Sequence, residues 1–286
     1  MADPVRKQPA GGVLDDDPFF YGSRWISVRL PDGRIVDEQI PLTPDDLLDP
    51  QLGDQVTQSN RHSKMARRLI DLLEEHFDSR QDVHIVNDLK ILWGIPKLPE
   101  PSPDIAVIQG VWSDDEDWDS FDVQREGARP CLILEVVSSK DAATRRNDYE
   151  KKVEIYERAG IPEYLIYDPP TPVTRGRLLL TGHHLGADGC YRSIEPDDRG
   201  FLLSETTGLL FGIARDGRTP LVVNAATGKR LLTGREAAKK AKERARAAEE
   251  QARAAEEQAR KDAEARKAAE AEIVRLRAEL DRVKNS

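Results

Sequence analysis

The sequence contains little cysteine and few aromatic residues, and it has no long apolar run. Its 286 residues include two cysteines, Cys131 and Cys190, and 6% aromatic residues. Two cysteines without metal-knuckle spacing argue against a disulfide framework and a structural zinc site. No apolar run approaches the roughly 18 residues of a membrane-spanning helix, and the polar segment MADPVRKQPAGG lacks the apolar centre of a secretion signal. We therefore expect a soluble, cytoplasmic protein without a membrane partner.

Positive charge is also scarce outside the C-terminal segment. Residues 235–286 consist almost entirely of Ala, Glu, Arg, Lys and Gln, and their 15 basic and 12 acidic residues give +3. The whole chain has a net charge of −9, so residues 1–234 carry −12. An acidic domain lacks the general attraction for phosphate on which non-specific nucleic-acid binding depends. Any nucleic-acid interface must therefore depend on local basic clusters.

The most apolar part of the chain predicts a strand, a helix and a second strand. The run 131–137 is short and β-branched, which is typical of a buried strand. A helical pattern follows over 147–159, ends at Gly160, and leads into a second strand over 163–167. This order predicts a βαβ unit with a right-handed crossover. Glu135 interrupts the first strand, so it either meets a metal or cation there or lies at a solvated or arginine-paired strand end.

Shorter elements are predicted on both sides of this unit. Before it we expect a hairpin over 25–36, a helix over 61–77 capped by Ser59, and strands over 83–86, 89–93 and 105–108. After it, turn residues separate predicted antiparallel strands over 177–180, 191–194, 201–203 and 221–223. Residues 1–18 are expected to be disordered and the acidic residues 113–126 to form a loop.

Three further residues could carry chemistry together with Glu135. Asp104 lies at the entry to strand 105–108, Asp88 lies between two predicted strands, and Lys152 lies on the helix that follows Glu135. Two carboxylates on neighbouring strands, Asp104 and Glu135, can hold Mg²⁺ (or Mn²⁺) through their oxygen atoms. A nearby lysine can offset the charge that develops on a phosphate.

Basic residues gather in two places. We predict that they contact DNA phosphates: Arg61, Lys64, Arg67 and Arg68 on helix 61–77, and Arg145 and Arg146 before the next helix. A solvated helix face is the alternative interpretation of the first cluster.

The segments PSPDIAVI (101–108) and LILEVVSSKDAATRRNDYEKKVEIYERAGIPEYLIYDP (132–169) resemble the Uma2 family of the PD-(D/E)XK nuclease superfamily. The resemblance extends over roughly residues 55–234. It implies Mg²⁺-dependent hydrolysis of DNA phosphodiester bonds by Asp104, Glu135 and Lys152. It also assigns accessory positions to His62 and Asp148. The last of these is either a partner of Lys152 or a carboxylate favoured by the helix dipole.

One departure from the superfamily pattern concerns the lysine. The usual position, two residues after the second acid, holds Val137 here. The lysine must then come from the following helix, where Lys151 and Lys152 point about 100° apart. We expect Lys152 to face the site because it lies four residues after Asp148, as in the family.

With the family in view, we expect an α/β fold of the restriction-endonuclease type. It comprises a mixed central sheet flanked by helices, an antiparallel β extension, and a C-terminal α-helical coiled coil. Residues 19–234 would form the nuclease-like domain and 235–286 the coiled coil. The alternative function is a catalytically silent nuclease-fold module that binds DNA or assembles oligomers. An interaction protein that acts only through its tail is a third reading, against which the intact Asp104, Glu135 and Lys152 argue.

Residues 235–286 show a heptad pattern. The unit AAEEQAR occurs at 247–253 and 254–260, and only Asp262 and Arg266 break the register. The seam positions of the six heptads are Ala241, Ala245, Ala248, Ala252, Ala255, Ala259, Ala269, Ile273, Leu276, Leu280 and Val283. A period of 3.5 residues predicts a left-handed coiled coil that is weak along its alanine seam and strongest at its Ile/Leu/Val end. A lone helix with i,i+4 ion pairs is the alternative.

We predict that the tail makes the protein self-associate, because an apolar seam gains stability only when a second helix covers it. Sedimentation equilibrium of the full chain should give a multimer, and a 1–234 truncation should give a monomer. Equal association states for both proteins would contradict a self-pairing tail. A dimer that survives truncation would locate the interface in the remaining domain.

Overall fold

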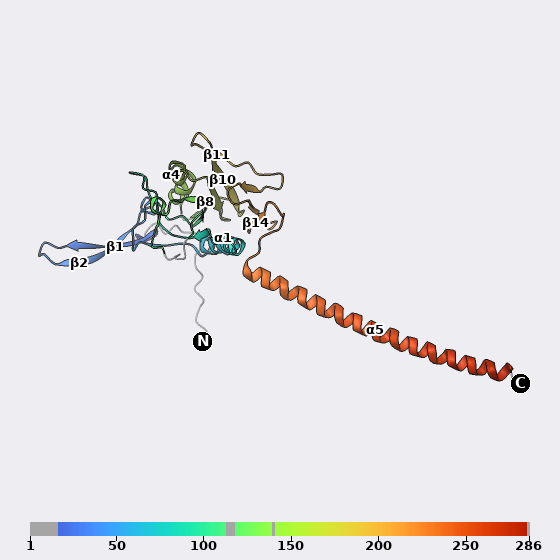
Figure 1. The fold of residues 1–286 in the computed structure, drawn as a ribbon. Coiled ribbons are helices and arrows are strands. Elements are labelled where there is room, and N and C mark those ends of the chain that lie inside the picture. Colours follow the sequence, from blue (N-terminus) through green and yellow to red (C-terminus); the bar gives the residue numbers. More distant parts are fainter. Residues whose placement is uncertain (1–16, 113–117, 139–140, 285–286) are drawn as a thin grey trace, which may run out of the picture. The chain divides into compact units, whose positions relative to one another are not determined.

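The computed structural model of the protein describes residues 17–112, 118–138 and 141–284. Our predictions for residues 1–16 and 113–117 lie outside these ranges. The chain divides into two compact units, Met1–Leu231 and Leu232–Ser286 (Figure 1). No helix of the described residues is long and apolar enough to span a membrane.

A six-stranded mixed sheet forms the centre of the first unit. Its strand order is β11-β10-β9-β8-β6-β4. β8 and β9 pair in parallel and the other neighbours pair antiparallel, which confirms the predicted βαβ unit. The bounds are β4 Val83–Val86, β6 Ile105–Gln109, β8 Pro130–Val136, β9 Glu163–Asp168, β10 Leu179–Leu185 and β11 Tyr191–Ser193.

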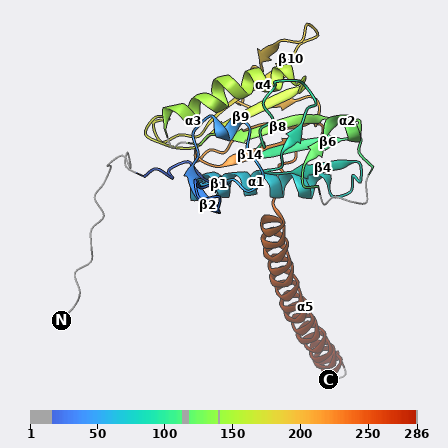
Figure 2. The ribbon, with the colours of Figure 1, turned by 90° about the vertical axis from the view of Figure 1, so that its left-hand side faces the viewer.

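Helices cover both faces of this sheet (Figure 2). One face packs against α1 (Asn60–Phe77), and the other packs against the crossover between β8 and β9. Because successive strand residues point to opposite faces, β8 contributes alternately to the two cores. Leu132 and Leu134 join the core under α1, whereas Ile133 joins the core under the crossover. Glu135 therefore points toward the crossover helices.

The helix α1 matches its prediction closely. The Ser59 side chain accepts a hydrogen bond from the His62 backbone N–H at 3.2 Å and so caps the first turn. Leu69, Leu72 and Leu73 recur on one side of the helix and are fully buried. The buried leucines fix the rotation of α1, and this rotation aims His62 toward the sheet.

The crossover begins earlier than the predicted helix 147–159. It consists of α3 (Ala142–Arg146), a π-helical turn η2 (Asn147–Lys151) and α4 (Lys152–Arg158). Asp141 and Thr144 form a capping box, in which the Asp141 carboxylate accepts the Thr144 N–H at 2.8 Å. This cap starts the helix five residues before the apolar periodicity does.

Smaller sheets complete the unit, and they correct several predictions. The hairpin is confirmed as β1 (Gly22–Arg29) and β2 (Ile35–Pro41), with β3 (Gln55–Val56) beside β1. The predicted strand 89–93 shortens to β5 (Ile91–Leu92), which pairs with β7 (Phe121–Asp122). Residues 121–126 are thus not loop, since α2 (Val123–Glu126) follows β7. Short elements also include η1 Asp46–Leu48, β12 Leu202–Ser204, β13 Leu209–Ile213 and β14 Pro220–Asn224, of which β13 was not predicted as a strand.

The second unit consists mainly of one helix, α5 (Gly234–Lys284). The described seam residues Ile273 and Leu276 are about half exposed in the single chain, at 50% and 53%. The helix is thus present as expected, and its pairing stays a prediction.

Leu69→Ala should lower the free energy of unfolding by about 2–5 kcal/mol, because Leu69 is fully buried between α1 and the sheet. Urea denaturation followed by circular dichroism measures this change. Leu203→Ala is the matched control, since Leu203 is 40% exposed and should change the stability by less than about 1 kcal/mol. Equal effects of the two substitutions would show that the packing of α1 is wrong.

Candidate functional site

The pairing of β6 with β8 brings two carboxylates onto one face of the sheet. Ile105 pairs with Leu134 in antiparallel register, so the next position on each strand places Asp104 opposite Glu135. Directly opposed residues in an antiparallel pair point to the same side. Both side chains are almost completely buried, with relative exposures of 9% and 1%. Two buried acids this close require compensating positive charge or hydrogen-bond donors.

The first of these carboxylates is held from two directions. Asp104 Oδ2 accepts a hydrogen bond from the Val136 N–H at 2.7 Å and lies 3.0 Å from His62 Nε2. His62 is itself buried, and its Nδ1 atom has no hydrogen-bond partner among the described residues. The contact between α1 and β6 therefore fixes the orientation of Asp104 at the edge of the sheet.

The second carboxylate meets the lysine that the sequence singled out. Lys152 Nζ lies 2.9 Å from Glu135 Oε2 and 3.0 Å from Asp148 Oδ1. Tyr156, one turn further along α4, donates a hydrogen bond to Glu135 Oε1 at 2.8 Å. Asp148 also accepts from the Ser138 N–H at 3.3 Å. Both oxygens of Glu135 thus face groups on the crossover helix.

The neighbouring lysine points elsewhere. Lys151 Nζ forms an ion pair with Asp45 at 2.5 Å, in the loop before η1. The π-helical turn ends at Lys151, directly before α4 begins with Lys152. π-Helical turns are rare and occur frequently at functional sites. At this turn Lys151 points to the loop with Asp45, and Lys152 points to the buried acids.

Burial and charge determine the protonation of this cluster. Burial raises the pKa of both Glu135 and Asp148. Burial opposes charge on Lys152, but the two carboxylates outweigh it and raise the pKa of the lysine. Burial also lowers the pKa of His62, yet the Asp104 carboxylate outweighs it and raises the value to about 9. The same pairing lowers the pKa of Asp104, although burial alone would raise it.

These residues line a cleft with a volume of about 890 Å³. His62, Asp104, Glu135, Asp148 and Lys152 share it. Residues 50–54, Asp88 and Lys90 line the same cleft. The cluster is therefore buried but borders an open cleft.

Two residues of the loop between β4 and β5 belong to this cleft. Asp88 adopts a positive φ of 50°, and burial and the Asp104 carboxylate raise its pKa. Lys90 was not predicted as a site residue, since a lone lysine between two short apolar runs gives no periodic signal. Its Nζ atom donates a hydrogen bond to Asp49 Oδ1 at 2.8 Å.

The six predicted DNA-binding residues do not line this cleft. Arg61, Lys64 and Arg68 line a second cleft of about 520 Å³, beside the turn that precedes β14. Arg146 pairs with Glu150 at 2.8 Å on the surface. Arg145 forms an ion pair with the buried carboxylate of Asp168. The last of these contacts assigns Arg145 a structural role, because removing it would leave a buried charge unpaired.

The donor set fits a hard divalent cation. Mg²⁺ is commonly bound by one or two carboxylates and completes its shell with water and substrate phosphate. Asp104 and Glu135 supply two such carboxylates at a cleft that is open to solvent. Within the described ranges, no group of three or more His, Cys, Asp or Glu side chains is arranged as a metal site. A metal here would therefore take its remaining ligands from water or substrate.

A comparison with protein-family models agrees with the resemblance noted from the sequence. A family model described as "Uma2: Putative restriction endonuclease" matches residues 46–217. A search of curated proteins finds no match. Among solved structures, the chain is similar to a crystal structure described as a "putative nuclease belonging to DUF820" from Anabaena variabilis ATCC 29413. The identity is 15%, the match covers 60% of this chain and 78% of that chain, and the TM-score is 0.34.

The family match includes Asp104, Glu135 and Lys152 and extends from η1 almost to β14. It covers more than half of the sequence, and the chain therefore belongs to the Uma2 family.

Proposed function

We propose that this protein is a divalent-metal-dependent endonuclease that hydrolyses phosphodiester bonds in DNA. The proposal depends on how three side chains meet at one cleft. Asp104 and Glu135 lie opposite each other on adjacent strands, and Lys152 Nζ lies 2.9 Å from Glu135. Membership of a family described as "Putative restriction endonuclease" supports a nuclease. The chemistry of the cluster suits an anionic substrate only when a cation offsets the carboxylates.

Asp104 and Glu135 would hold Mg²⁺ or Mn²⁺, which would polarise a phosphoryl oxygen and activate water. His62 and the Val136 N–H hold Asp104 in a fixed position. Tyr156 does the same for Glu135. The chain thus provides ligands whose geometry is set before any metal binds.

Lys152 provides a positive charge that burial keeps in place. Its side chain is 12% exposed, and Asp148 lies one turn before it on the same side of the helix. A preorganised charge stabilises the negative charge that develops on the phosphoryl oxygens in the transition state. Asp148 positions the lysine by pairing with it. Lys152 on α4 therefore supplies the positive charge. In the usual superfamily pattern, a lysine at the position of Val137 supplies it.

The alternative is a catalytically silent nuclease-fold module that binds DNA or assembles oligomers through α5. Two observations favour it: residues 1–234 carry a charge of −12, and the heptad pattern extends over most of α5. The two functions differ in whether the carboxylate pair binds metal and whether Lys152 matters. A cytoplasmic location and a homo-oligomeric state belong to both proposals.

Asp104→Asn should weaken Mn²⁺ binding by about tenfold or more, because it removes one of two carboxylate ligands. Isothermal titration calorimetry of the full chain measures the affinity. Asp119→Asn is the matched control, since Asp119 lines the same cleft but lies outside the strand pair. An unchanged affinity in Asp104→Asn, or the absence of Mn²⁺ binding by the folded protein at millimolar concentrations, would count against the metal site.

Lys152→Ala should lower the rate of plasmid cleavage in Mg²⁺ or Mn²⁺ by roughly 10²–10³. Lys151→Ala is the matched control and should leave the rate nearly unchanged, because Lys151 pairs with Asp45 outside the cluster. Glu135→Ala serves as the inactive reference.

Agarose gels of supercoiled, nicked and linear plasmid give the rates, and circular dichroism checks the fold of each variant. Full activity in both lysine variants would refute the role assigned to α4. No cleavage by the native chain under any metal would support the silent module.

A further inference from the structure

A tight turn stands at the rim of the catalytic cleft and presents an apolar side chain to solvent. Leu52 is fully exposed, and it is the most exposed large hydrophobic residue in the described part of the chain. It lines the same cleft as Asp104 and Glu135. Single exposed leucines are common on protein surfaces, so exposure alone carries no meaning. Two further features indicate a role for Leu52: ion pairs anchor its turn, and the cleft beside it is acidic.

The turn itself is closed by its own hydrogen bonds. The Asp54 N–H donates to the Gln51 carbonyl oxygen at 3.1 Å, and the Gln51 N–H donates to Asp54 Oδ2 at 2.9 Å. Gly53 has a φ of +92°, as a type II turn requires at its third residue. Leu52 and Gly53 thus form the tip of a four-residue turn, and a Cβ atom added at Gly53 would touch nothing.

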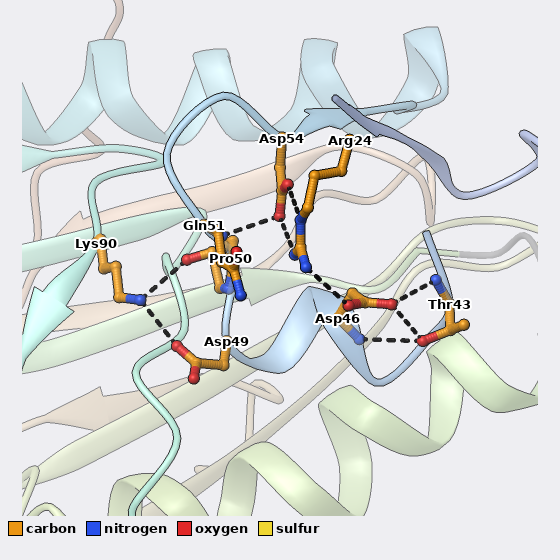
Figure 3. A network of polar contacts seen from close by, with 8 residues as sticks. All are labelled: Arg24, Thr43, Asp46, Asp49, Pro50, Gln51, Asp54 and Lys90. Carbon is orange, nitrogen blue, oxygen red and sulfur yellow. Dashed lines mark hydrogen bonds and ion pairs between the residues drawn. The ribbon is translucent and has the colours of Figure 1, made fainter. Parts of the chain in front are cut away.

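Ion pairs fix both ends of this turn to the body of the domain (Figure 3). Arg24 on β1 contacts both carboxylate oxygens of Asp54 at 2.6 and 2.7 Å, and the Asp54 side chain is 3% exposed. At the other end, Lys90 Nζ lies 2.8 Å from Asp49 and 2.9 Å from the Pro50 carbonyl oxygen. Bidentate arginine pairs fix geometry as well as adding stability. The backbone of the turn that carries Leu52 is therefore anchored on both sides.

The charge of the cleft shows why an apolar contact matters there. Three basic side chains line it, namely His62, Lys90 and Lys152, against seven acidic ones, namely Asp54, Asp88, Glu100, Asp104, Asp119, Glu135 and Asp148. Phosphate contacts normally supply most of the affinity for DNA. An acidic cleft supplies little of it beyond what a bound metal provides. A DNA substrate must therefore gain affinity from contacts that do not depend on charge.

We propose that Leu52 is a wedge that inserts between stacked bases of duplex DNA and positions the adjoining phosphodiester in the cleft. The proposal rests on the proposed function, because it takes DNA as the substrate. Apolar side chains that enter a base step unstack it and bend the duplex. Unstacking is easiest at flexible pyrimidine–purine steps and at mismatches. Leu52 would thus make cleavage sensitive to the deformability of the DNA, through a residue that contacts neither metal nor scissile phosphate.

The test uses the full chain carrying Glu135→Ala, so that bound DNA is not cut, and a duplex with 2-aminopurine beside a central mismatch. 2-Aminopurine fluorescence rises when the base unstacks, and anisotropy of a fluorescein label on the same duplex reports binding. We expect a clear rise on binding of the Glu135→Ala chain. Leu52→Ala in that background should lose most of the rise and weaken binding by about five- to tenfold, whereas Leu52→Phe should keep the rise. Leu203→Ala, an exposed leucine on β12 outside the cleft, is the control.

The outcomes separate this inference from the proposed function. Binding without a rise in fluorescence, or an equal rise with Leu52→Ala, would overturn the wedge, while plasmid cleavage by the native chain would still support the nuclease. A rise that depends on Leu52 in a protein that never cleaves would support the wedge and refute the nuclease. An unchanged anisotropy at all protein concentrations, for the Glu135→Ala chain and for the native chain with Mg²⁺, would overturn the wedge, because DNA would then not be a ligand.

Discussion

The structure of the site depends on one buried ammonium group. Lys152 Nζ lies within 3.0 Å of two carboxylates, Glu135 and Asp148, which are both almost completely buried. Removing one member of a buried ion cluster leaves an uncompensated charge and destabilises a protein by about 3–5 kcal/mol. The sheet register that aligns Glu135 with Asp104, and the helix that carries the lysine, therefore stabilise each other. The same charge that holds the acids together also lines the cleft.

Because the lysine lies on a helix, an apolar residue can occupy its usual position after the strand and pack in the core. Val137, at the position that usually holds the lysine, is fully buried and pairs through its N–H with the Tyr167 carbonyl oxygen at 2.8 Å. Tyr156 and Tyr164 pack against each other beneath the crossover, with ring centroids 4.9 Å apart. The Tyr164 hydroxyl donates to the Asp148 carbonyl oxygen at 2.9 Å. Aromatic packing and hydrogen bonds therefore fix the helix that the polar cluster needs.

Periodicity revealed the elements that pack, and it missed those set by caps and long-range contacts. The βαβ unit and α1 follow from apolar spacing, and the need of Glu135 for a cationic partner follows from the cost of a buried carboxylate. The choice of Lys152 as that partner comes from its spacing after Asp148, which matches the family. The early start of the crossover at Asp141 depends on a capping box, and the π-helical turn has no apolar signature. The placement of Lys90 in the cleft depends on its contact with Asp49, which lies 41 residues earlier in the chain. Local sequence does not encode such a contact.

The crossover layer is held differently along its length. Its three helical segments are short, and their first turn depends on the Asp141–Thr144 capping box. β8 and β9, in contrast, lie in the middle of the six-stranded sheet. Helix ends unfold locally at lower free energy than central strands. Fraying from Asp141 would loosen α3 first, while the buried Ile155 and Tyr156 keep α4 and its Lys152 on the sheet. The capping box can therefore open without separating the cation of this site from its anions.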